Sequence, residues 1–496
     1  MADHGSTKNC VVTAKSRGAA EPAQLLLWEM NAAHPHGPSA NAAPPIAIIG
    51  AGIAGLSAAW HLQQAGASVV LFEASGRAGG AIASIRRDGW LHEAGPNSIL
   101  EGAPEVEELI TALNLSGRRI YAAPAARNRY VIRSGHLEAA PTSPLGFCRT
   151  HLFSSRAKWR VASEIFRPRG DRSESETVAE FTQRRWGKEF LDYAIDPMVG
   201  GIYAGDPTRL SIRHAFPKLL KLERQDRSLL LGAVRRRNTS GGPTGRIFSF
   251  VNGLRELPDA LAGTLGDSLR LNALILSVTP NRGRWEIVSQ QQQPVKESFS
   301  HVICTLPPDA LAALKFGDGA SLARLVEMRE VEQPPVASVF LGYRRSDVDH
   351  PLDGFGMLAP RIECRHILGC LFSSTLFPGR APAGYVGITA FVGGARQPVL
   401  GRLEEPDLVE WVHSELSQLL GIHARPVWTS IRRHSRSIPQ YTVEYDRFKN
   451  ICAEAERSAP GLLIGGKGRD GISLPACLAS GKRLAWAALG RPHFGS

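Results

Sequence analysis

The chain has 496 residues, of which 43% are hydrophobic and 21% charged, and its formal net charge is +12. Its length exceeds that of one small core, so two or three subdomains are expected, and the composition is that of an ordinary globular protein. The positive charge favours anionic partners such as acidic substrates or anionic lipid. Because no nucleic-acid-binding motif accompanies it, nucleic acid is not expected as a partner.

The first 44 residues are rich in Ala, Pro, Gly, His and Ser and are interpreted as a disordered extension. A transit peptide is the alternative, although Asp3, Glu21 and Glu29 are unusual in one. Further along, no apolar run reaches the ~18 residues of a membrane-spanning helix. The seven cysteines are scattered and form no C-x-x-C. They are therefore expected to be reduced packing residues, and no metal site is expected.

The segment from Pro45 to Glu73 predicts a strand, a glycine turn, a helix and a second strand. Its glycines Gly50, Gly52 and Gly55 form G-x-G-x-x-G. The first glycine permits a tight turn, the second lets a pyrophosphate approach, and the third lets helix and strand pack closely. The helix amino terminus offers free N–H groups to the phosphates. Glu73, at the end of the second strand, can accept hydrogen bonds from both ribose hydroxyls.

These features predict a bound dinucleotide; the alternative is a glycine turn without a ligand. Glu73 is followed by Arg77, Gly79 and Gly80, which form R-x-G-G. This extension resembles the one found after the second strand in flavoproteins of the amine oxidase and phytoene desaturase type. There the arginine and glycines approach the FAD pyrophosphate. The resemblance implies FAD rather than NAD as the cofactor.

The next segments predict a turn, a hairpin and helices. Residues 95–98 form a turn that is either an ordinary connection or, in a flavoprotein, a return of the chain beside the isoalloxazine. Residues 127–141 predict a hairpin with its turn at Ser134 and Gly135. Residues 176–199 predict two helices that are broken at Gly187 and end before Pro197.

Two stretches mix large apolar and basic residues, at 144–169 and 216–231. Either they form a basic amphipathic surface that lies on anionic membrane, or they are ordinary helices with a solvated basic face. Both interpretations stay open. Residues 235–245 predict a flexible boundary.

The second half of the chain predicts mainly strands, with one amphipathic helix at 406–420. A strand, a turn and a helix are expected from Ile247, and two strands with a turn at 281–283 follow. Near the end, a strand, a glycine loop and a helix from about Leu474 are expected. That helix directs its amino terminus at an anion or at the electron-rich edge of a flavin.

Several segments together resemble the FAD-dependent, oxygen-using protoporphyrinogen oxidase family. They run in the order of that family from Ile46 to Trp486, and they are GAGIAGLSAAW, GRAGG, EAGPNSI, DPMVGGIYAGDPTRLS, FVNGLRELPDAL, VICTLPPDAL, SIPQYTVEYDR and GISLPACLASG. The first two and the last are shared with amine oxidases and desaturases. DPMVGGIYAGDP and IPQY are more specific. One departure is at Gly466 and Lys467, where relatives often have Asn.

The resemblance implies an α/β fold with a discontinuous Rossmann-type FAD-binding domain, a strand-rich substrate domain and a helical membrane-facing domain. The expected FAD-binding domain comprises residues 45–120, 246–310 and 455–490. The expected substrate domain comprises residues 121–143 and 311–454, and the helical domain residues 144–245.

The implied reaction is the oxidation of protoporphyrinogen IX to protoporphyrin IX in three two-electron steps. Each step passes a hydride to flavin N5, and O2 is reduced to H2O2. Because the flavin carries this chemistry, no catalytic side chain is assigned. The expected partners are the porphyrinogen, O2 and an anionic membrane surface, with a possible homodimer, and the expected location is cytoplasmic and peripheral to the inner membrane. The alternatives are a coproporphyrinogen III oxidase, an amine oxidase or desaturase, and a catalytically silent flavin-binding protein.

The resemblance also assigns site residues. Those expected at FAD are Gly50, Gly52, Ile53, Ala54, Gly55, Glu73, Ala74, Arg77, Gly80, Gly95, Pro96, Asn97, Ser98, Val278 (a backbone contact to adenine), Ile472, Ser473 and Leu474. Those expected at the substrate are Arg129, Gly200, Gly201, Leu358, Leu371 and Phe391. Arg129 is expected to bind a propionate bidentately, and its alternative is a solvated hairpin arginine. The two glycines would let backbone approach the macrocycle.

Overall fold

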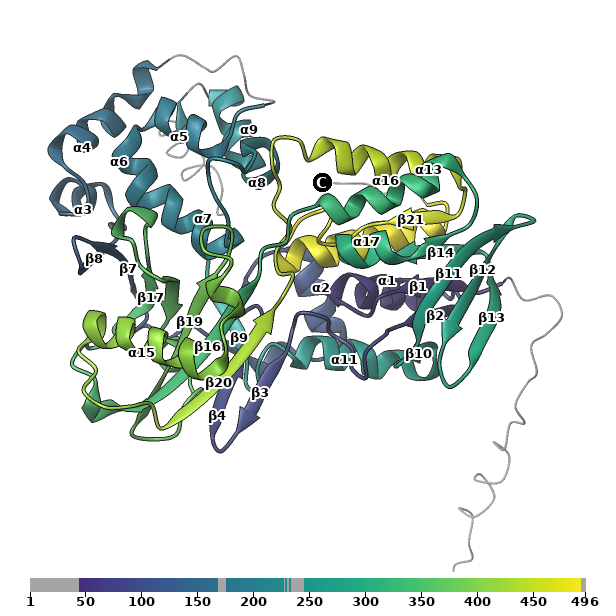
Figure 1. The fold of residues 1–496 in the computed structure, drawn as a ribbon, viewed down its shortest axis with the longest axis horizontal. Helices are drawn as coiled ribbons and strands as arrows, with labels where there is room; N and C mark the ends of the chain where they lie inside the picture. The colour runs from purple at the N-terminus through teal and green to yellow at the C-terminus, as the bar shows by residue number, and fades with distance from the viewer. Residues whose placement is uncertain (1–43, 168–174, 227, 230–231, 233–244, 492–496) are drawn as a thin grey trace, which may run out of the picture. The chain divides into compact units, whose positions relative to one another are not determined.

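The computed structural model describes residues 44–167, 175–226, 228–229, 232 and 245–491 (Figure 1). The expected N-terminal extension lies outside the described residues except for Pro44. The expected boundary at 235–245 also lies outside them, apart from Gly245.

A parallel sheet brings together strands from distant parts of the chain. Its order is β10-β2-β1-β14-β21. The strands are β1 (Ile46–Ile49), β2 (Val69–Phe72), β10 (Leu269–Arg270), β14 (His301–Cys304) and β21 (Leu462–Ile464). All of β1 is buried, as expected for a short apolar strand covered on both faces.

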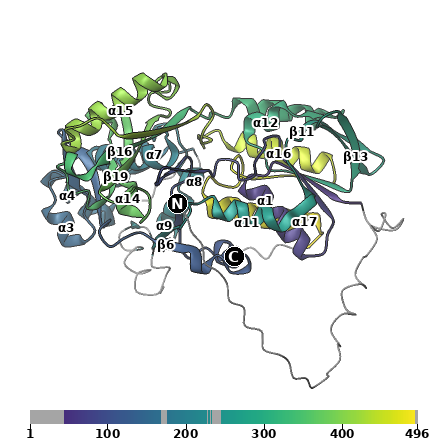
Figure 2. The same ribbon diagram turned by 90° about the horizontal axis from the view of Figure 1, so that it is seen from below.

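Helices α1 (Ile53–Gln64) and α17 (Leu474–Ala488) pack closely beside this sheet (Figures 1 and 2). A glycine permits the contact, because a Cβ on Gly481 would lie 2.3 Å from the carbonyl oxygen of Ala54. Ser57 adds a hydrogen bond of 2.9 Å to the Leu478 carbonyl. The first and last segments of the described chain therefore form one unit, and the helix predicted from Leu474 is confirmed.

A second sheet has seven strands in the order β20-β16-β19-β18-β17-β7-β8. They are β7 (Asn128–Arg133), β8 (His136–Ala139), β16 (Val336–Arg344), β17 (Gly354–Leu358), β18 (Ile367–Leu371), β19 (Tyr385–Gly393) and β20 (Trp428–His434). Helix α15 (Glu405–Leu420) covers one face, and its Leu408 and Val412 belong to the same buried cluster as Met357, Cys370 and Ala390. Neighbouring residues along these strands point to the opposite face.

Three smaller sheets complete the strands. A four-stranded sheet has the order β13-β12-β11-β15, with β11 (Leu274–Asn281), β12 (Arg284–Gln290), β13 (Pro294–Phe299) and β15 (Lys315–Phe316). A two-stranded sheet pairs β3 (Ser84–Arg87) with β4 (Trp90–Glu93). A three-stranded sheet has the order β5-β9-β6, with β5 (Ile99–Leu100), β6 (Arg119–Tyr121) and β9 (Ile247–Phe250). Helices α2 (Pro104–Ala112), α11 (Glu256–Leu265) and α12 (Pro308–Ala313) lie between these strands in the chain, and α16 (Asp446–Ser458) lies between β20 and β21.

Short helices follow one another from residue 144 to residue 226. They are α3 (Pro144–Arg149), α4 (Ser155–Ala162), α5 (Val178–Arg185), α6 (Lys188–Phe190), α7 (Asp196–Tyr203), α8 (Ile212–Ala215) and α9 (Pro217–Asp226). The predicted break at Gly187 is confirmed, and that residue has a φ of +93°. The predicted end before Pro197 is wrong. A π-helical turn at Leu191–Ile195 leads directly into α7 and places Pro197 in its first turn, where the missing N–H is tolerated.

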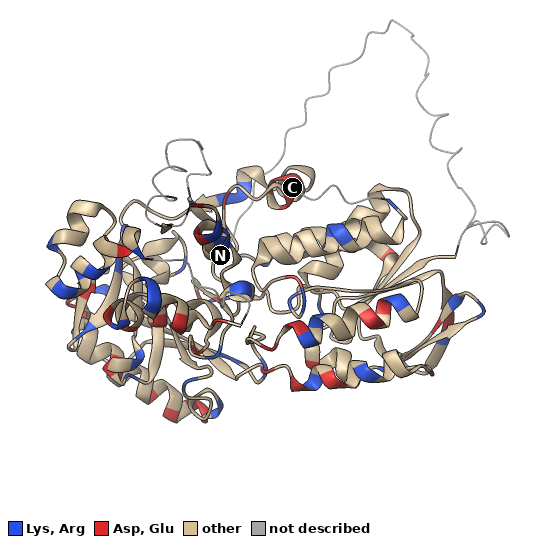
Figure 3. Ribbon diagram, turned by 90° about the horizontal axis from the view of Figure 1, so that it is seen from above, with Lys and Arg blue, Asp and Glu red and all other residues tan. Residues whose placement is uncertain are grey.

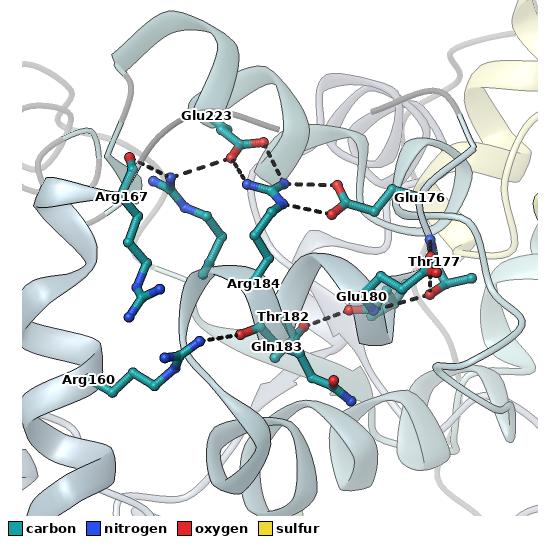
Figure 4. A network of polar contacts seen from close by, with 11 residues as sticks. Arg160, Arg167, Glu176, Thr177, Glu180, Thr182, Gln183, Arg184 and Glu223 are labelled. Carbon is teal, nitrogen blue, oxygen red and sulfur yellow. Dashed lines mark hydrogen bonds and ion pairs between the residues drawn. The ribbon is translucent and has the colours of Figure 1, made fainter. Parts of the chain in front are cut away.

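A polar network joins these helices (Figure 4). Arg184 on α5 donates to both oxygens of Glu176 at 2.8 Å and to Glu223 on α9 at 2.7 Å. Arg185, which is fully buried, contacts Glu164 and Glu223. Because removing one partner of a buried ion pair is strongly destabilising, this network fixes the helices relative to one another.

The α/β class predicted from the sequence is confirmed by these sheets and helices. From Pro44 onward the chain forms one compact unit, so the three-domain boundaries stay a prediction. Among the described residues, no helix has the length and apolar character needed to span a membrane.

Candidate functional site

The glycine turn after β1 forms an open cradle at the carboxyl edge of the parallel sheet. Gly50 has a φ of +98°, and a Cβ on Gly55 would lie 2.0 Å from the carbonyl oxygen of Gly50. Apart from its own chain neighbours, no described residue has an atom within 4 Å of a Cβ position on Gly52. Helix α1 begins after Gly52 with no side-chain cap and no acid in its first turn, which includes Ile53 and Ala54. Its free N–H groups and the open space therefore fit a diphosphate.

Glu73 lies beside this cradle, as predicted. Its Oε2 accepts from the Ala51 N–H at 2.9 Å, and its Oε1 accepts from the N–H and hydroxyl of Ser75 at 2.9 and 2.7 Å. The carboxylate thus holds the glycine turn as well as standing where a ribose is expected. Ala74 lies between Glu73 and Ser75 in the turn. The ribose contact itself stays a prediction.

Arg77 braces the loop that follows. Its guanidinium donates to the carbonyls of Ala78, Gly80 and Ile82 at 3.2, 2.7 and 3.1 Å. Burial, followed by the charges of Arg432 and Arg255, lowers the pKa of Arg77. This clustering of positive charge fits an anionic ligand, and the predicted pyrophosphate contact stays a prediction.

The loops at 79–82 and 95–98 pack against the cradle. A Cβ on Gly80 would lie 3.1 Å from the Gly52 Cα, and a Cβ on Gly95 would lie 1.9 Å from the Ala81 carbonyl oxygen. Asn97 donates to the Gly95 carbonyl at 2.9 Å. Pro96 and Ser98 lie in the same turn, which ends where β5 begins. The glycines are therefore required for loop packing.

The C-terminal loop closes the same edge of the sheet. Ser473 caps α17 by accepting from the Ala476 N–H at 3.3 Å, and Ile472 and Leu474 flank it. Sequence reasoning missed Thr305, which follows β14 and donates from its hydroxyl to the Gly50 carbonyl at 2.9 Å. The sequence did offer a signal for Thr305. It directly follows a predicted buried strand, and neighbouring parallel strands end at the same edge of a sheet.

The structure does not bring Val278 to the cradle. The Ala273 N–H donates to the Glu73 carbonyl at 2.8 Å, so the chain passes the ribose position there. Val278 lies five residues further along, ~16 Å for an extended strand. It is fully buried, and its carbonyl accepts from the Gly317 N–H at 2.9 Å. An adenine contact therefore fits the residues just after Ala273 better than Val278.

The predicted substrate walls share one face of the seven-stranded sheet. Gly369 is paired with both Leu358 and Phe391, and Leu371 is paired with Gly356. Paired residues point to the same face, so these three side chains lie opposite the face covered by α15. All three are only partly buried, which leaves apolar surface available.

Helix α7 packs against this face. A Cβ on Gly201 would lie 2.8 Å from the Leu358 Cδ2, and a Cβ on Gly200 would lie 2.8 Å from the Arg396 Nη2. Arg396 pairs with Asp196 at 2.9 Å and donates to the Ala359 carbonyl at 2.9 Å. The sequence offered no sign that Arg396 takes part. At Gly200 the packing of Arg396 favours glycine, and the predicted approach of both glycines to the macrocycle stays a prediction.

Arg129 lies on β7, on the same side of the sheet. Its strand pairs with β17 so that Arg129 faces Gly356 across the ladder. The side chain is exposed, and its guanidinium carbon lies 5.5 Å from the centre of the Phe355 ring. In the part of the chain that the structure describes, no carboxylate forms an ion pair with it. It is free to bind an anionic substrate group.

Cradle, loops and sheet define a dinucleotide-binding α/β protein with an apolar, cation-edged site. The model for flavin-containing amine oxidoreductases matches residues 53–489. The chain therefore belongs to this family. It is an FAD-dependent oxidoreductase.

Its relatives include porphyrinogen oxidases. It is 34% identical to the mitochondrial protoporphyrinogen oxidase of Nicotiana tabacum, over 90% of this chain and 94% of that one. It is 31% identical to the protoporphyrinogen oxidase of Homo sapiens, over 90% and 98%. It is 30% identical to the coproporphyrinogen III oxidase of Staphylococcus aureus, over 89% and 98%.

Solved structures show the same fold. A crystal structure from Exiguobacterium sp. 255-15, which carries a protoporphyrinogen oxidase assignment, matches with a TM-score of 0.78 and 26% identity over 90% of this chain and 99% of that one. A reduced UDP-galactopyranose mutase matches with a TM-score of 0.69 and 16% identity over 90% and 94%. The second likeness concerns the fold alone.

Proposed function

We propose that the protein oxidises protoporphyrinogen IX to protoporphyrin IX, a step of haem biosynthesis. Six hydrogens leave the macrocycle in three two-electron steps, and three O2 are reduced to three H2O2. Bound FAD supplies the hydride acceptor. The residues of the chain bind the cofactor, orient the macrocycle and shield it from side reactions.

One observation carries the proposal. Leu358, Leu371 and Phe391 share a half-buried sheet face, and Arg129, on the strand at its side, has no carboxylate partner among the described residues. A porphyrinogen is a large apolar macrocycle with carboxylates along one edge. A pocket for it needs apolar walls and a few well-placed cations. An amine substrate would not need the unpaired cation.

Coproporphyrinogen III is the second candidate substrate, because relatives of similar identity bear that name. It has four propionates, whereas protoporphyrinogen IX has two propionates and two vinyl groups. Apolar walls with few cations favour the less charged molecule. Assaying both porphyrinogens side by side tests the choice, and a higher kcat/KM for coproporphyrinogen III would overturn it. A colourless protein without flavin absorbance would overturn both.

Peripheral association with anionic membrane is also proposed, for the helices at 144–166. Trp159, Phe166 and Leu145 are 76%, 83% and 60% exposed. The exposed Arg149 and Arg156 lie beside them in the chain. Exposed aromatic residues among cations suit an interface with anionic lipid. Figure 3 shows basic and acidic positions interleaved through the described chain, so the proposal depends on this local set and not on net charge.

Two apolar residues within the predicted stretch 144–169 do not belong to this surface. Leu152 and Phe153 are buried against Val131 and Ala157. Residues 168–169 and part of the second stretch lie outside the described residues.

Flotation with vesicles tests the surface. The protein should float with anionic vesicles at low salt, and salt should weaken the binding by screening. The double variant Trp159→Ser/Phe166→Ser should float less. Val399→Ser is the control, because Val399 is equally exposed, at 71%, in another part of the chain. Equal flotation with neutral and anionic vesicles would remove the electrostatic part. The homodimer stays a prediction, which sedimentation of the purified protein tests.

A further inference from the structure

Lys467 is a half-buried lysine in the loop that joins β21 to α17. Its Nζ donates to the Ser437 carbonyl at 2.9 Å. Within the described ranges, no carboxylate forms an ion pair with it. An ammonium has three donors, so this contact leaves two of them for another acceptor. Burial lowers the pKa of Lys467, whereas the nearby Asp309 and Cys477 act to raise it.

The loop that carries Lys467 is continuous with the cofactor cradle. The Gly465 N–H donates to the Cys304 carbonyl at 3.0 Å, and the Thr305 N–H donates to the Ile49 carbonyl at 3.0 Å. A Cβ on Gly466 would lie 3.8 Å from the Ala54 Cβ, in the first turn of α1. Lys467 therefore follows the third of three adjacent parallel strands at the edge where open α/β sheets bind ligands.

On its other side, Lys467 meets the end of the seven-stranded sheet. Ser437 follows β20, whose last residue His434 hydrogen-bonds to the Ala94 carbonyl at 2.8 Å. Ala94 directly precedes the turn at 95–98, which is expected beside the flavin ring. Ser437, the acceptor for Lys467, is only three residues beyond His434 in the chain, and the charge of Lys467 acts to lower the pKa of His434. The ammonium thus lies where the cofactor loops meet the substrate sheet.

We propose that Lys467 is an electrostatic residue for the cofactor, whose ammonium stabilises the reduced flavin and raises its reduction potential. The inference rests on FAD binding in the cradle. Reduction by two electrons with uptake of one proton leaves the flavin ring negatively charged. A cation with no carboxylate partner, in a site partly removed from water, stabilises that charge. The role is not to transfer a proton.

Among the described residues, the charges around Lys467 offset its positive charge only in part, because Asp309 also has other partners. Asp309 accepts from Gln333 at 3.0 Å and lies 3.7 Å from Arg436. Burial raises the pKa of Cys477 to about 12, so its thiol is neutral at physiological pH. Tyr441 donates its hydroxyl to the Lys467 carbonyl at 2.6 Å, and burial raises its pKa as well. Beyond His434, Arg432 and Arg77 add further positive charge.

The test compares Lys467→Met, which keeps the chain length without the charge, with Lys467→Arg, which keeps the charge. The midpoint potential of bound FAD is measured across neutral and alkaline pH. Lys467→Met should lower the potential and change its pH dependence from one proton toward two protons per two electrons. Lys467→Arg should retain both properties. Lys482→Met is the control, because Lys482 lies further along α17 and pairs with Glu108 at 2.6 Å.

Sulfite provides a second probe, because it adds to oxidised flavin and leaves a negative charge on the ring. Lys467→Met should bind sulfite about tenfold more weakly than the unmodified protein. Unchanged potential and sulfite affinity with full FAD content would overturn the inference. Equal losses in Lys467→Met and Lys467→Arg would overturn it too, since a structural role would then explain both. Absence of FAD from the unmodified protein would instead overturn the proposed function.

Discussion

Arg129 and Arg133 lie four positions apart on β7 and point to the same face, yet they have different partners. Arg133 pairs with Glu189 at 3.0 Å, and its guanidinium lies 4.3 Å from the centre of the Tyr193 ring. It therefore holds the helices at 188–195 against the sheet. Among the described residues, Arg129 forms no ion pair with a carboxylate, and its guanidinium lies over the Phe355 ring. The difference supports the proposed substrate role of Arg129 and gives Arg133 a role in stability.

Arg129→Ala should lower kcat/KM. The loss of transition-state stabilisation should be about 1–3 kcal/mol, the range for a hydrogen bond to a charged group that is left unmade. The loss should be mainly in KM, with a smaller loss in kcat if the macrocycle is misplaced against the flavin. FAD content should not change. Steady-state kinetics and the flavin absorbance check both parts.

Arg127→Ala is the matched control, since Arg127 is exposed and precedes the same strand. It should behave as the unmodified protein. Arg133→Ala is unsuitable as a control, because the ion pair it removes is structural and the variant should unfold at a lower temperature. If Arg129→Ala has the kinetics of Arg127→Ala, the propionate assignment is wrong.

Glu73→Ala should weaken FAD retention. The substitution removes the acceptor for the Ala51 and Ser75 N–H groups and the predicted ribose contacts together. Each hydrogen bond to a charged group contributes ~1.5–3 kcal/mol. The Kd for FAD, measured by fluorescence of the released flavin, should rise more for Glu73→Ala than for Glu73→Gln, which keeps one carbonyl oxygen. Finding NAD and no flavin in a denatured extract would contradict the cofactor assignment.

At the scale of elements, helix α7 approaches its neighbours most closely at its two glycines, Gly200 and Gly201. In a helix interior, alanine is more stable than glycine by ~1 kcal/mol. A Gly→Ala substitution would therefore stabilise the helix at a position where the added methyl group met no other atom. Gly200→Ala should instead lose about 1–3 kcal/mol by overpacking, because Arg396 is held by Asp196 and Ala359 and cannot move aside. Urea unfolding measures the change.

Gly201→Ala should have a different effect. Its Cβ would meet the flexible end of Leu358, which can turn away at little cost in stability. Because Leu358 is a predicted substrate wall, KM should rise. If Gly201→Ala lost as much stability as Gly200→Ala and left KM unchanged, the predicted contact of α7 with a movable Leu358 would be wrong.

Local patterns predicted many of these elements. The Ser134–Gly135 turn has φ values of 51° and 79°, as its residue types favour, and the hairpin formed where expected. The helix at Pro197 was missed, because a proline tolerated in a first turn is indistinguishable by sequence from one that ends a helix. Arg396 was missed, and Lys467 was noticed only as a departure from the family pattern, because the contacts of both depend on partners from distant segments. The positions of the motifs could be predicted from the sequence. The contacts that give each residue its role could not, because they join segments that are far apart in the chain.

At the scale of the whole molecule, the hairpin of β3 and β4 joins the cofactor region to the seven-stranded sheet. Trp90 stacks on Trp428 with ring centres 5.7 Å apart. The His92 ring nitrogens lie 3.0 Å from the hydroxyls of Ser430 and Ser338. Glu93 approaches Arg380 at 3.5 Å, and both are buried. A buried polar set thus fixes the position of the substrate walls relative to the cradle.

This junction predicts a loss of stability in mild acid. Burial, with a smaller effect of His434, lowers the pKa of His92 from 6.5 to about 4. Between these two values the unfolded chain binds a proton that the folded protein does not, so the free energy of unfolding falls as pH falls. The slope is ~1.4 kcal/mol per pH unit for one such histidine. His61, whose pKa burial also lowers to about 4, should add a similar slope.

Urea unfolding at several pH values within this window measures the combined slope. His92→Gln should reduce it by ~1.4 kcal/mol per pH unit, because glutamine can hydrogen-bond to both serines but binds no proton. His423→Gln is the control, since His423 is exposed and its partner Asp349 is exposed as well. If His92→Gln and the unmodified protein lose stability in parallel as the pH falls, His92 is not held neutral by the junction.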